Sequence, residues 1–309
     1  MSEFVFKGLH TGLLGKVYLQ LGEPAKALEN FETAETELDK LPAKARATAD
    51  VRRDRAQLRD QKAAALFKLG KPADAEKEHD AALAELDKLA REFPKEPVFV
   101  RDVAFSKQQA GDFYLFDTKD VGRALAVYAP SYAAVAAQAN ADPDNLGLKR
   151  ELAHLSYRMG YVAEQLAANA PLGRAGLRNV SRGYYAECLA LRQDLAKADP
   201  RDTHLQIDVL VALGRLGRTA DVRKGADALL KAHPDDRFVL FQTACALAIV
   251  SGCGNGPEVP ECRKQALGVL ARLVDNGWKD RVALETDPDL EAVRGADEFK
   301  TLVAKLPKR

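Results

Sequence analysis

The stretch Leu13–Ala34 constrains the fold of this chain more than any other. Both halves carry apolar residues at helical spacing: Leu14, Tyr18 and Leu21 in the first, and Ala27, Phe31 and Ala34 in the second. Between them, Gly22-Glu23-Pro24 predicts a turn, because Gly tolerates a positive φ at a helix end and Pro suits the first turn of the next helix. Neither helix can bury its apolar stripe alone. The stretch therefore predicts two amphipathic helices folded back on each other.

The same punctuation recurs along the chain. One series predicts turns inside helix pairs: Leu21-Gly22, Leu69-Gly70, Ala110-Gly111, Leu216-Gly217 and Ser251-Gly252. A second series predicts the ends of the return helices: Phe93-Pro94, Asp142-Pro143, Asp199-Pro200 and His233-Pro234. Because Pro cannot continue the preceding helix, each of these sites redirects the chain. Two interleaved series indicate helix–turn–helix units in tandem.

The predicted units are irregular in length. We place them at residues 4–41, 43–93, 95–141, 144–198, 201–233 and 236–277, followed by a C-terminal cap at 278–309. In the second unit, the charged stretch 42–62 is interpreted as a lengthened front half of the first helix. Its charges have both signs and it contains no aromatic residue, so we favour a solvated helix face over a nucleic-acid-binding patch. We expect an expanded turn after Gly111 in the third unit, and an irregular stretch at residues 172–183 in the fourth.

The C-terminal cap is predicted from its own capping signals. Thr286 or Asp287 can cap a short helix that has Pro288 in its first turn. Gly295 ends that helix, and Asp297 is expected to cap a last one with Phe299, Leu302, Val303 and Leu306 on one side. Since a helical array leaves the apolar face of its last pair open, a closing helix is expected there.

Composition and charge narrow the function classes. The chain has 309 residues and a formal net charge of +1, whereas a protein adapted to the nucleic-acid backbone normally shows a basic excess. The most apolar run, residues 238–252, is interrupted by Gln242 and is shorter than the ~20 residues needed to cross a bilayer. The N-terminal ten residues carry Glu3 and no apolar core for secretion. These features predict a soluble cytoplasmic protein that binds neither nucleic acid nor membrane.

The four cysteines leave two interpretations open. Cys253 and Cys262 flank a loop rich in Gly and Pro, and they can close it as a disulfide. Alternatively, all four cysteines, which include Cys188 and Cys245, are reduced thiols on helices and in one loop. The cysteines lack the paired C-x-x-C spacing that is typical of a zinc site, so none is expected.

No pattern of residues predicts catalysis or a cofactor. The five histidines form no H-x-x-x-H or H-E-x-x-H pair, so no metal site is expected. No serine or cysteine lies in a recognisable nucleophile elbow. The carboxylates occur at the spacings of solvated helix faces. We therefore expect a protein that is not an enzyme.

The first unit resembles a tetratricopeptide (TPR) motif. The resemblance rests on Gly15, Tyr18, Leu21-Gly22, Ala27, Phe31 and Ala34. It implies an all-α, right-handed TPR superhelix (α-solenoid) of about six irregular helix pairs, whose first helices line a concave groove for a peptide. Projection of the first helices gives candidate groove residues: Lys16, Gln20, Asp60, Lys68, Arg101, Gln109, Tyr157, Tyr161, Glu164, His204, Arg215 and Gln242. Tyr157 and Tyr161 are the best candidates for a hot spot, because Tyr gives a large contact area at low entropy cost.

A second resemblance covers most of the chain and is strongest from about Asp142 onward, especially near the C-terminus. The starts at Asp142–Asn145 and Asp199–Asp202, the run LKRELAHLSYRMGYV, the stretch ACALA at 244–248 and the C-terminal GWKD…TDPDLEAVRGADEF are similar to the TPR tails of serine/threonine kinases in planctomycete-like bacteria. This resemblance implies a regulatory tail. The chain itself carries no glycine-rich phosphate loop, HRD-type loop or DFG triplet.

Three functions remain open at this point. The leading prediction is a non-catalytic scaffold that binds a protein or peptide, as the tail of a bacterial kinase. The second is a segment of a kinase whose catalytic domain lies outside this sequence. The third is a self-assembly element in which the first helix pair, which has no capping segment before it, stacks on a second copy of the chain.

Overall fold

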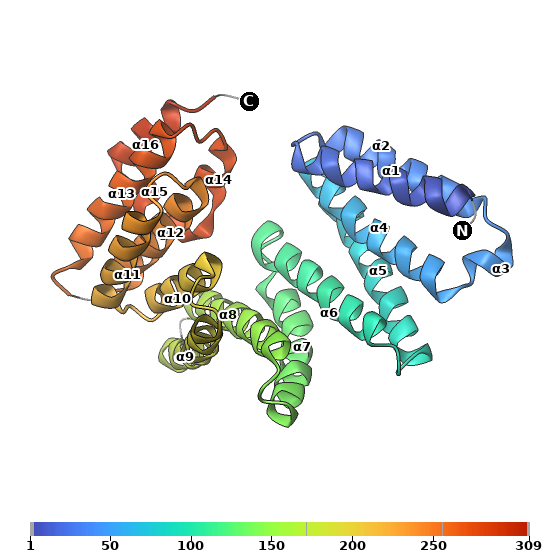
Figure 1. Ribbon diagram of the computed structural model, residues 1–309, viewed down its shortest axis with the longest axis horizontal. Helices are drawn as coiled ribbons and strands as arrows, with labels where there is room; N and C mark the ends of the chain where they lie inside the picture. Colours follow the sequence, from blue (N-terminus) through green and yellow to red (C-terminus); the bar gives the residue numbers. More distant parts are fainter. Residues whose placement is uncertain (1–2, 171, 255, 308–309) are drawn as a thin grey trace. The chain divides into compact units, whose positions relative to one another are not determined.

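The computed structural model describes residues 3–170, 172–254 and 256–307, without the side chains of residues 3–6, 9, 97, 100 and 101. Its regular structure is helical throughout the described residues, which confirms the predicted all-α class (Figure 1). The chain forms two compact units, Met1–Ser131 and Tyr132–Arg309, and the division falls within one helix, α7. The expected single domain over residues 1–309 stays a prediction, and each unit is described by itself below.

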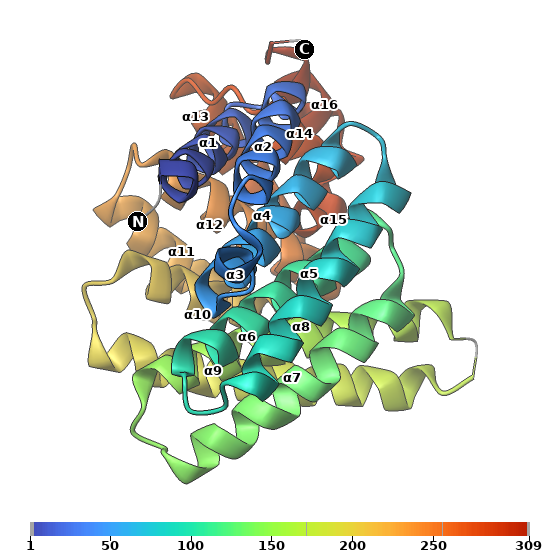
Figure 2. The same cartoon turned by 90° about the vertical axis from the view of Figure 1, so that its right-hand side faces the viewer.

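Unit 1 is built from three helix pairs. Their helices are α1 (Glu3–Gln20) with α2 (Pro24–Asp39), α4 (Ala49–Lys68) with α5 (Pro72–Glu92), and α6 (Pro97–Asp112) with the first part of α7 (Val121–Ala141); a short helix, α3 (Ala43–Arg46), joins the first two pairs. Figure 2 shows α1 beside α2 and α4 beside α5. Successive pairs pack on each other, α2 against α4 and α5 against α6, and they bury Phe31, Leu38 and Leu86 between them.

Unit 2 continues with the rest of α7 and three more pairs. These are α8 (Leu146–Asn169) with α9 (Arg174–Ala198), α10 (Thr203–Arg215) with α11 (Thr219–Ala232), and α12 (Arg237–Cys253) with α13 (Val259–Asp275). The chain then closes with α14 (Arg281–Thr286), the 3-10 turn η2 (Pro288–Leu290), α15 (Glu291–Arg294) and α16 (Asp297–Ala304). One hydrophobic core extends from Tyr157 on α8 to Leu306. The described residues thus form six helix pairs and the predicted closing helix.

A glycine beneath an aromatic ring joins the two helices in three of the pairs. A Cβ atom built on Gly15 would lie 2.5 Å from the Phe31 ring, and one built on Gly160 would lie 2.8 Å from the Tyr185 ring. In the third pair, a Cβ atom built on Gly111 would lie 2.6 Å from the Tyr128 ring. Only glycine allows an approach this close, because any Cβ would overlap the ring. This packing is what the TPR resemblance implies for the small and aromatic positions of each unit.

Turn glycines end the first helices where the sequence predicts. Gly22, Gly70 and Gly217 have φ of 76°, 74° and 69°, a region that glycine adopts without a Cβ penalty. Two of the predicted turns are helical instead. Gly111 lies inside α6, and Ser251-Gly252 lies in the last turn of α12.

The predicted turn after Gly111 is replaced by a π-turn, η1 (Phe113–Asp117). The helix therefore continues past Gly111, and the chain reverses only at Lys119, whose φ is 60°. The wider turn directs Phe113, Tyr114 and Leu115 into the core, where all three are buried. The apolar run that was expected to form an expanded loop is thus a helical part of the core.

Two other stretches are more helical or more interrupted than expected. The stretch 172–183 was expected to be irregular, but α9 begins at Arg174 and runs without a break to Ala198. The stretch 42–62 was expected to belong to one long helix, but it forms α3, a break, and the start of α4. At the break, the Thr48 hydroxyl donates a hydrogen bond of 2.8 Å to the carbonyl oxygen of Ala45. Such local bonds compete with helix continuation.

Side-chain caps begin the first helix of each pair in unit 2. Asn145, Asp202 and Asp236 each accept hydrogen bonds from the amides two and three residues ahead, at 2.9–3.3 Å. At the C-terminal cap, Asp287 accepts from the amide of Asp289, as the sequence predicts. The last helix differs, because its cap position is Ala296 and Asp297 is already in its first turn.

Candidate interaction surfaces

A groove over α1, α4 and α6 is the first candidate site in unit 1. Two cavities of about 230 and 220 Å³ share Lys16 and Gln57 in their linings, so they form one groove. Leu13 lines one cavity and is 58% exposed, and Phe105 lines the other and is 52% exposed. The groove therefore presents an apolar side chain in each half.

Polar groups lie between these apolar side chains. Asp102 is fixed by Arg53 and by Gln57, whose amide nitrogen donates to it at 3.1 Å. Gln61 also lines the groove, and its side-chain amide makes no hydrogen bond within the described part of the chain. An amide offers both a donor and an acceptor, which is what the main chain of an extended peptide requires.

The structure places the predicted groove residues of unit 1 in different environments. Lys16 lines both cavities. Asp60 lies at the base of the second cavity but is buried, with its carboxylate 3.1 Å from Nδ1 of His79. Gln20 and Lys68 are exposed outside the two cavities, and Gln109 is half-buried. The side chain of Arg101 lies outside the described residues.

Other residues, not predicted from the sequence, shape this groove. Phe105 is four residues after Arg101 and four before Gln109, so the helical spacing of the predicted pair already contained it. Gln57 and Gln61 likewise share one face of α4 at a spacing of four, whereas the chosen Asp60 faces α5. A projection that is off by one residue turns the helix by about 100°.

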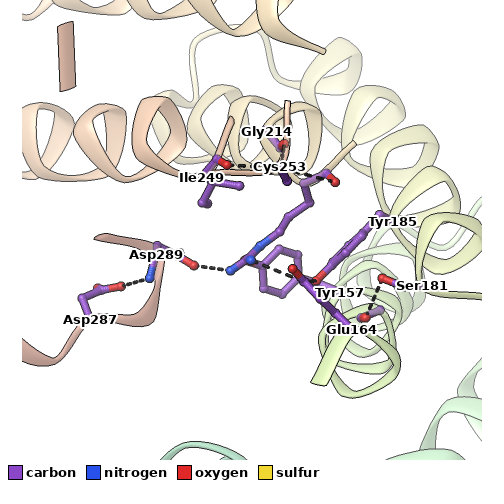
Figure 3. Close-up of polar contacts among 11 residues, drawn as sticks. Tyr157, Glu164, Ser181, Tyr185, Gly214, Ile249, Cys253, Asp287 and Asp289 are labelled. Atoms are coloured by element: carbon purple, nitrogen blue, oxygen red, sulfur yellow. Dashed lines mark hydrogen bonds and ion pairs between the residues drawn. The ribbon is translucent and has the colours of Figure 1, made fainter. Parts of the chain in front are cut away.

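A buried ionic cluster in unit 2 gathers four of the other predicted residues. The Arg215 guanidinium donates to the Tyr157 hydroxyl at 3.1 Å and lies 3.4 Å from Glu164 (Figure 3). Its Cζ atom is 5.0 Å from the centre of the Tyr161 ring. It also pairs with Asp289 of η2, so the cluster ties α8 and α10 to the C-terminal cap. Of the remaining two predicted residues, His204 is exposed and Gln242 is half-buried.

The cluster perturbs its titratable groups. Burial raises the pKa of Tyr157 to about 12 and that of Tyr161 to about 12. Burial, with the nearby charge of Asp289, raises the pKa of Asp287 to about 6. The carboxyl of Asp287 therefore changes charge near neutral pH, while the tyrosines stay neutral.

The two tyrosines were expected to form an exposed hot spot. Tyr157 and Tyr161 are instead only 7% and 8% exposed. The reason is tertiary, because Arg215 reaches them from a helix more than 50 residues further on. Helical spacing identifies the face on which the tyrosines lie, but it cannot show that an arginine covers it.

The cysteines are all free thiols, so the disulfide between Cys253 and Cys262 is not formed. Cys262 is buried within α13, whose first turns occupy the sequence expected to be loop. The Cys253 thiol lies 3.1 Å from the carbonyl oxygen of Gly214. Burial raises the pKa of all four thiols, to about 11 for Cys188, which makes them weak nucleophiles at neutral pH.

Neither a membrane-spanning helix nor a metal-binding group is found among the described residues. None of the helices in these residues is long and apolar enough to cross a membrane. The same residues contain no group of three or more His, Cys, Asp and Glu placed to hold a metal ion.

Comparisons with known proteins give little further guidance. No protein-family model matches the chain, and no curated protein matches it. Among solved structures, the chain is similar to the crystal structure of the P58(IPK) TPR domain, at 14% identity over 99% of both chains. The TM-score of that match is 0.26, which is too low to support any argument. The architecture therefore rests on the helix pairs and contacts of this chain.

Proposed function

We propose that this chain is a non-catalytic scaffold that binds an extended peptide in the groove over α1, α4 and α6. The observation that carries the proposal is the pairing of two half-exposed apolar side chains, Leu13 and Phe105, across a groove that also holds Gln57 and Gln61. Hydrophobic anchors supply most of the binding energy of a peptide, and amides supply bonds to its main chain.

The charges of the groove define the peptide further. Lys16 lies on one wall, whereas Asp54 and Asp102 lie on the other helices. Asp102 is already paired with Arg53, so its charge is largely compensated. A peptide with two apolar side chains and no strong net charge fits this lining best.

A peptide selected from a randomised display library against the full chain tests the proposal. Its affinity is measured by fluorescence anisotropy for the wild type and for Leu13→Ser and Phe105→Ser. We expect each substitution to weaken binding by about tenfold, because each removes an apolar anchor. Val180→Ser is the matched control, since Val180 is 49% exposed on α9 of unit 2.

The outcomes separate clearly. Equal binding by wild type, L13S and F105S would show that the groove is not the site. Circular dichroism confirms that each variant is folded, which is expected because both side chains are half exposed.

One observation favours a second function, self-assembly through the first helix pair. Leu14 and Val17 on α1 are 43% and 48% exposed, and Leu21, directly after the helix, is 67% exposed. Their spacing places them on one stripe, away from the glycines that face α2. We propose that this stripe packs against a second copy of the chain, and the test is given in the Discussion.

Association with a bacterial kinase rests on the sequence resemblance alone. No contact described above adds to it, and the proposal of a peptide-binding scaffold does not depend on it.

A further inference from the structure

A cavity lined by four arginines lies where α3, α4 and α5 meet in unit 1. Its volume is about 240 Å³, and its lining consists of Arg46, Arg52, Arg55, Arg59, Ala56 and Glu85. Arg52, Arg55 and Arg59 share one face of α4 at spacings of three and four, and Arg46 comes from α3. The break at Thr48 allows α3 to turn back toward α4, so it brings Arg46 to the cavity.

This cavity and the peptide groove lie on different faces of α4. The groove uses Gln57, Leu58 and Gln61, whereas the cavity uses Arg52, Arg55 and Arg59. At about 100° per residue, these two sets point to nearly opposite sides of the helix. A ligand in the cavity is therefore independent of a peptide in the groove.

Carboxylates fix two of the arginines. Arg52 bonds Glu85 through Nε and Glu92 through Nη1, both at 2.5 Å. Arg55 bonds Asp39 at 2.6 Å. Of these three acids only Glu85 lines the cavity, so the others hold the guanidinium groups in place from outside.

The other two arginines are not held by short hydrogen bonds to carboxylates. Arg46 is exposed and makes no ion pair within the described residues. Arg59 lies 3.9 Å from Glu35 and 3.7 Å from Glu78, beyond hydrogen-bond distance, and its Nε atom is buried without a hydrogen-bond partner.

Lys62 lies beside Arg59 and pairs with the same two carboxylates. Its ammonium group lies 2.7 Å from Oε2 of Glu35 and 3.0 Å from Oε1 of Glu78, whereas Arg59 Nε is nearest to the other oxygen of each carboxylate. Arg59 is therefore oriented by ion pairs without a short hydrogen bond, and its side chain lines the cavity.

We propose that this cavity binds a phosphoryl group, either at the end of a side chain or as free phosphate. Guanidinium groups match the geometry of phosphate oxygens and bond them in pairs. The cavity is smaller than the ~300 Å³ lower limit of sites for drug-sized ligands, so it suits a small group rather than a whole nucleotide.

Isothermal titration calorimetry of the full chain at low ionic strength tests this proposal. Three probes are used: inorganic phosphate, a phosphoserine peptide with Gly and Ala flanks and blocked termini, and the same peptide without phosphate. We expect heat of binding from the phosphate-bearing probes only. Added salt weakens binding, because the charges of the rim are partly exposed.

Variants locate the site. Arg46→Gln is expected to weaken binding by about threefold, and R46Q with R59Q by about tenfold or more, since charge-assisted hydrogen bonds are lost. Arg178→Gln is the control, because Arg178 is exposed on α9 of unit 2 and its substitution makes the same charge change. If the double variant does not fold, the phosphate affinity of R46Q alone tests the site, since Arg46 is exposed and makes no ion pair within the described residues.

Each outcome has a clear meaning. Binding of both phosphate-bearing probes, weakened by R46Q, supports a site for phosphorylated side chains. Binding of inorganic phosphate alone supports the site and assigns it to the free anion. The absence of binding by every probe, or unchanged affinity in the arginine variants, would overturn the proposal.

Discussion

Glycine, which has no side chain, sets the distance between the paired helices in this protein. Gly15, Gly111 and Gly160 each lie under an aromatic ring of the return helix. The fifth pair achieves the same fit with the sizes exchanged, because a Cβ on Gly225 of α11 would lie 2.7 Å from Leu210 of α10. In both arrangements a large side chain fills the space that a glycine leaves, so the total volume rather than the residue identity is preserved.

The glycine contact makes a stability prediction. Gly160→Ala places a Cβ 2.8 Å from the Tyr185 ring, so we expect it to lower the free energy of unfolding by about 1–3 kcal/mol. Gly183→Ala is the control, because no atom of another residue lies within 4 Å of its Cβ position in α9. It should raise the free energy of unfolding by about 0.5–1 kcal/mol, since Ala is a better helix former. Urea denaturation measures both, and equal effects of the two variants would contradict the packing described here.

Asp287 makes a prediction about pH. Its pKa is raised to about 6 in the folded chain, above the value of about 3.9 in an unfolded chain. The folded state thus binds more protons between these values, so Asp287 destabilises the fold increasingly as pH rises from about 4 to 6 and by a constant amount above that. Asp287→Asn keeps an acceptor for the Asp289 amide and removes the charge.

We expect D287N to be more stable than the wild type at pH 7.5 by about 1–2 kcal/mol, after allowance for solvent screening. The advantage should shrink as pH falls below 6, because the wild-type carboxyl becomes protonated in the folded state. Urea unfolding of both proteins at several pH values is the measurement. A difference that is independent of pH would show that the carboxyl is not perturbed.

At the scale of helices, capping side chains and turn glycines determine most of the boundaries. Asn145, Asp202 and Asp236 begin α8, α10 and α12, and all three follow short turns that the sequence marks with Pro. The exceptions are where core packing overrides the local signal. Gly111 reads as a helix end, yet its position under Tyr128 keeps it inside α6.

The cap of α10 gives a measurable effect. Asp202→Ala removes the acceptor for the amides of His204 and Leu205, so we expect a loss of about 0.5–2 kcal/mol in the free energy of unfolding. Asp194→Ala provides the comparison, because Asp194 is an exposed residue paired only with Lys197 on the same helix. Its effect should stay below about 0.5 kcal/mol. Thermal and urea unfolding test the pair, and a D202A effect no larger than that of D194A would contradict the cap.

For the whole molecule, the apolar stripe on α1 predicts association between copies. The average mass measured by sedimentation equilibrium should rise above the 33.7 kDa of one chain as the concentration increases. Leu14→Glu should hold the chain at the monomer mass, because it places a charge within the apolar contact. Val180→Glu, an equally exposed site on α9, should have no effect. A wild-type chain that stays monomeric at every concentration would exclude this interface.

Local physical rules let the sequence predict the helix pairs, the turn glycines Gly22, Gly70 and Gly217, the cap at Asp287 and the apolar face of the last helix. Helical periodicity, caps and turns act over a few residues, so they can be identified without a structure. The π-turn after α6 and the helical start of α9 could not be predicted, because packing of distant residues stabilises them against the local signals.

The candidate sites depended still more on tertiary structure. Periodicity identified the exposed faces of the first helices, and on these faces Lys16 does line the groove. Only the folded chain shows that Arg215 covers Tyr157 and that Lys62 and Arg59 share the carboxylates of Glu35 and Glu78. The physical reason is the same in each case: a side chain's partners are set by residues that are far away in the sequence, and helix spacing contains no information about them.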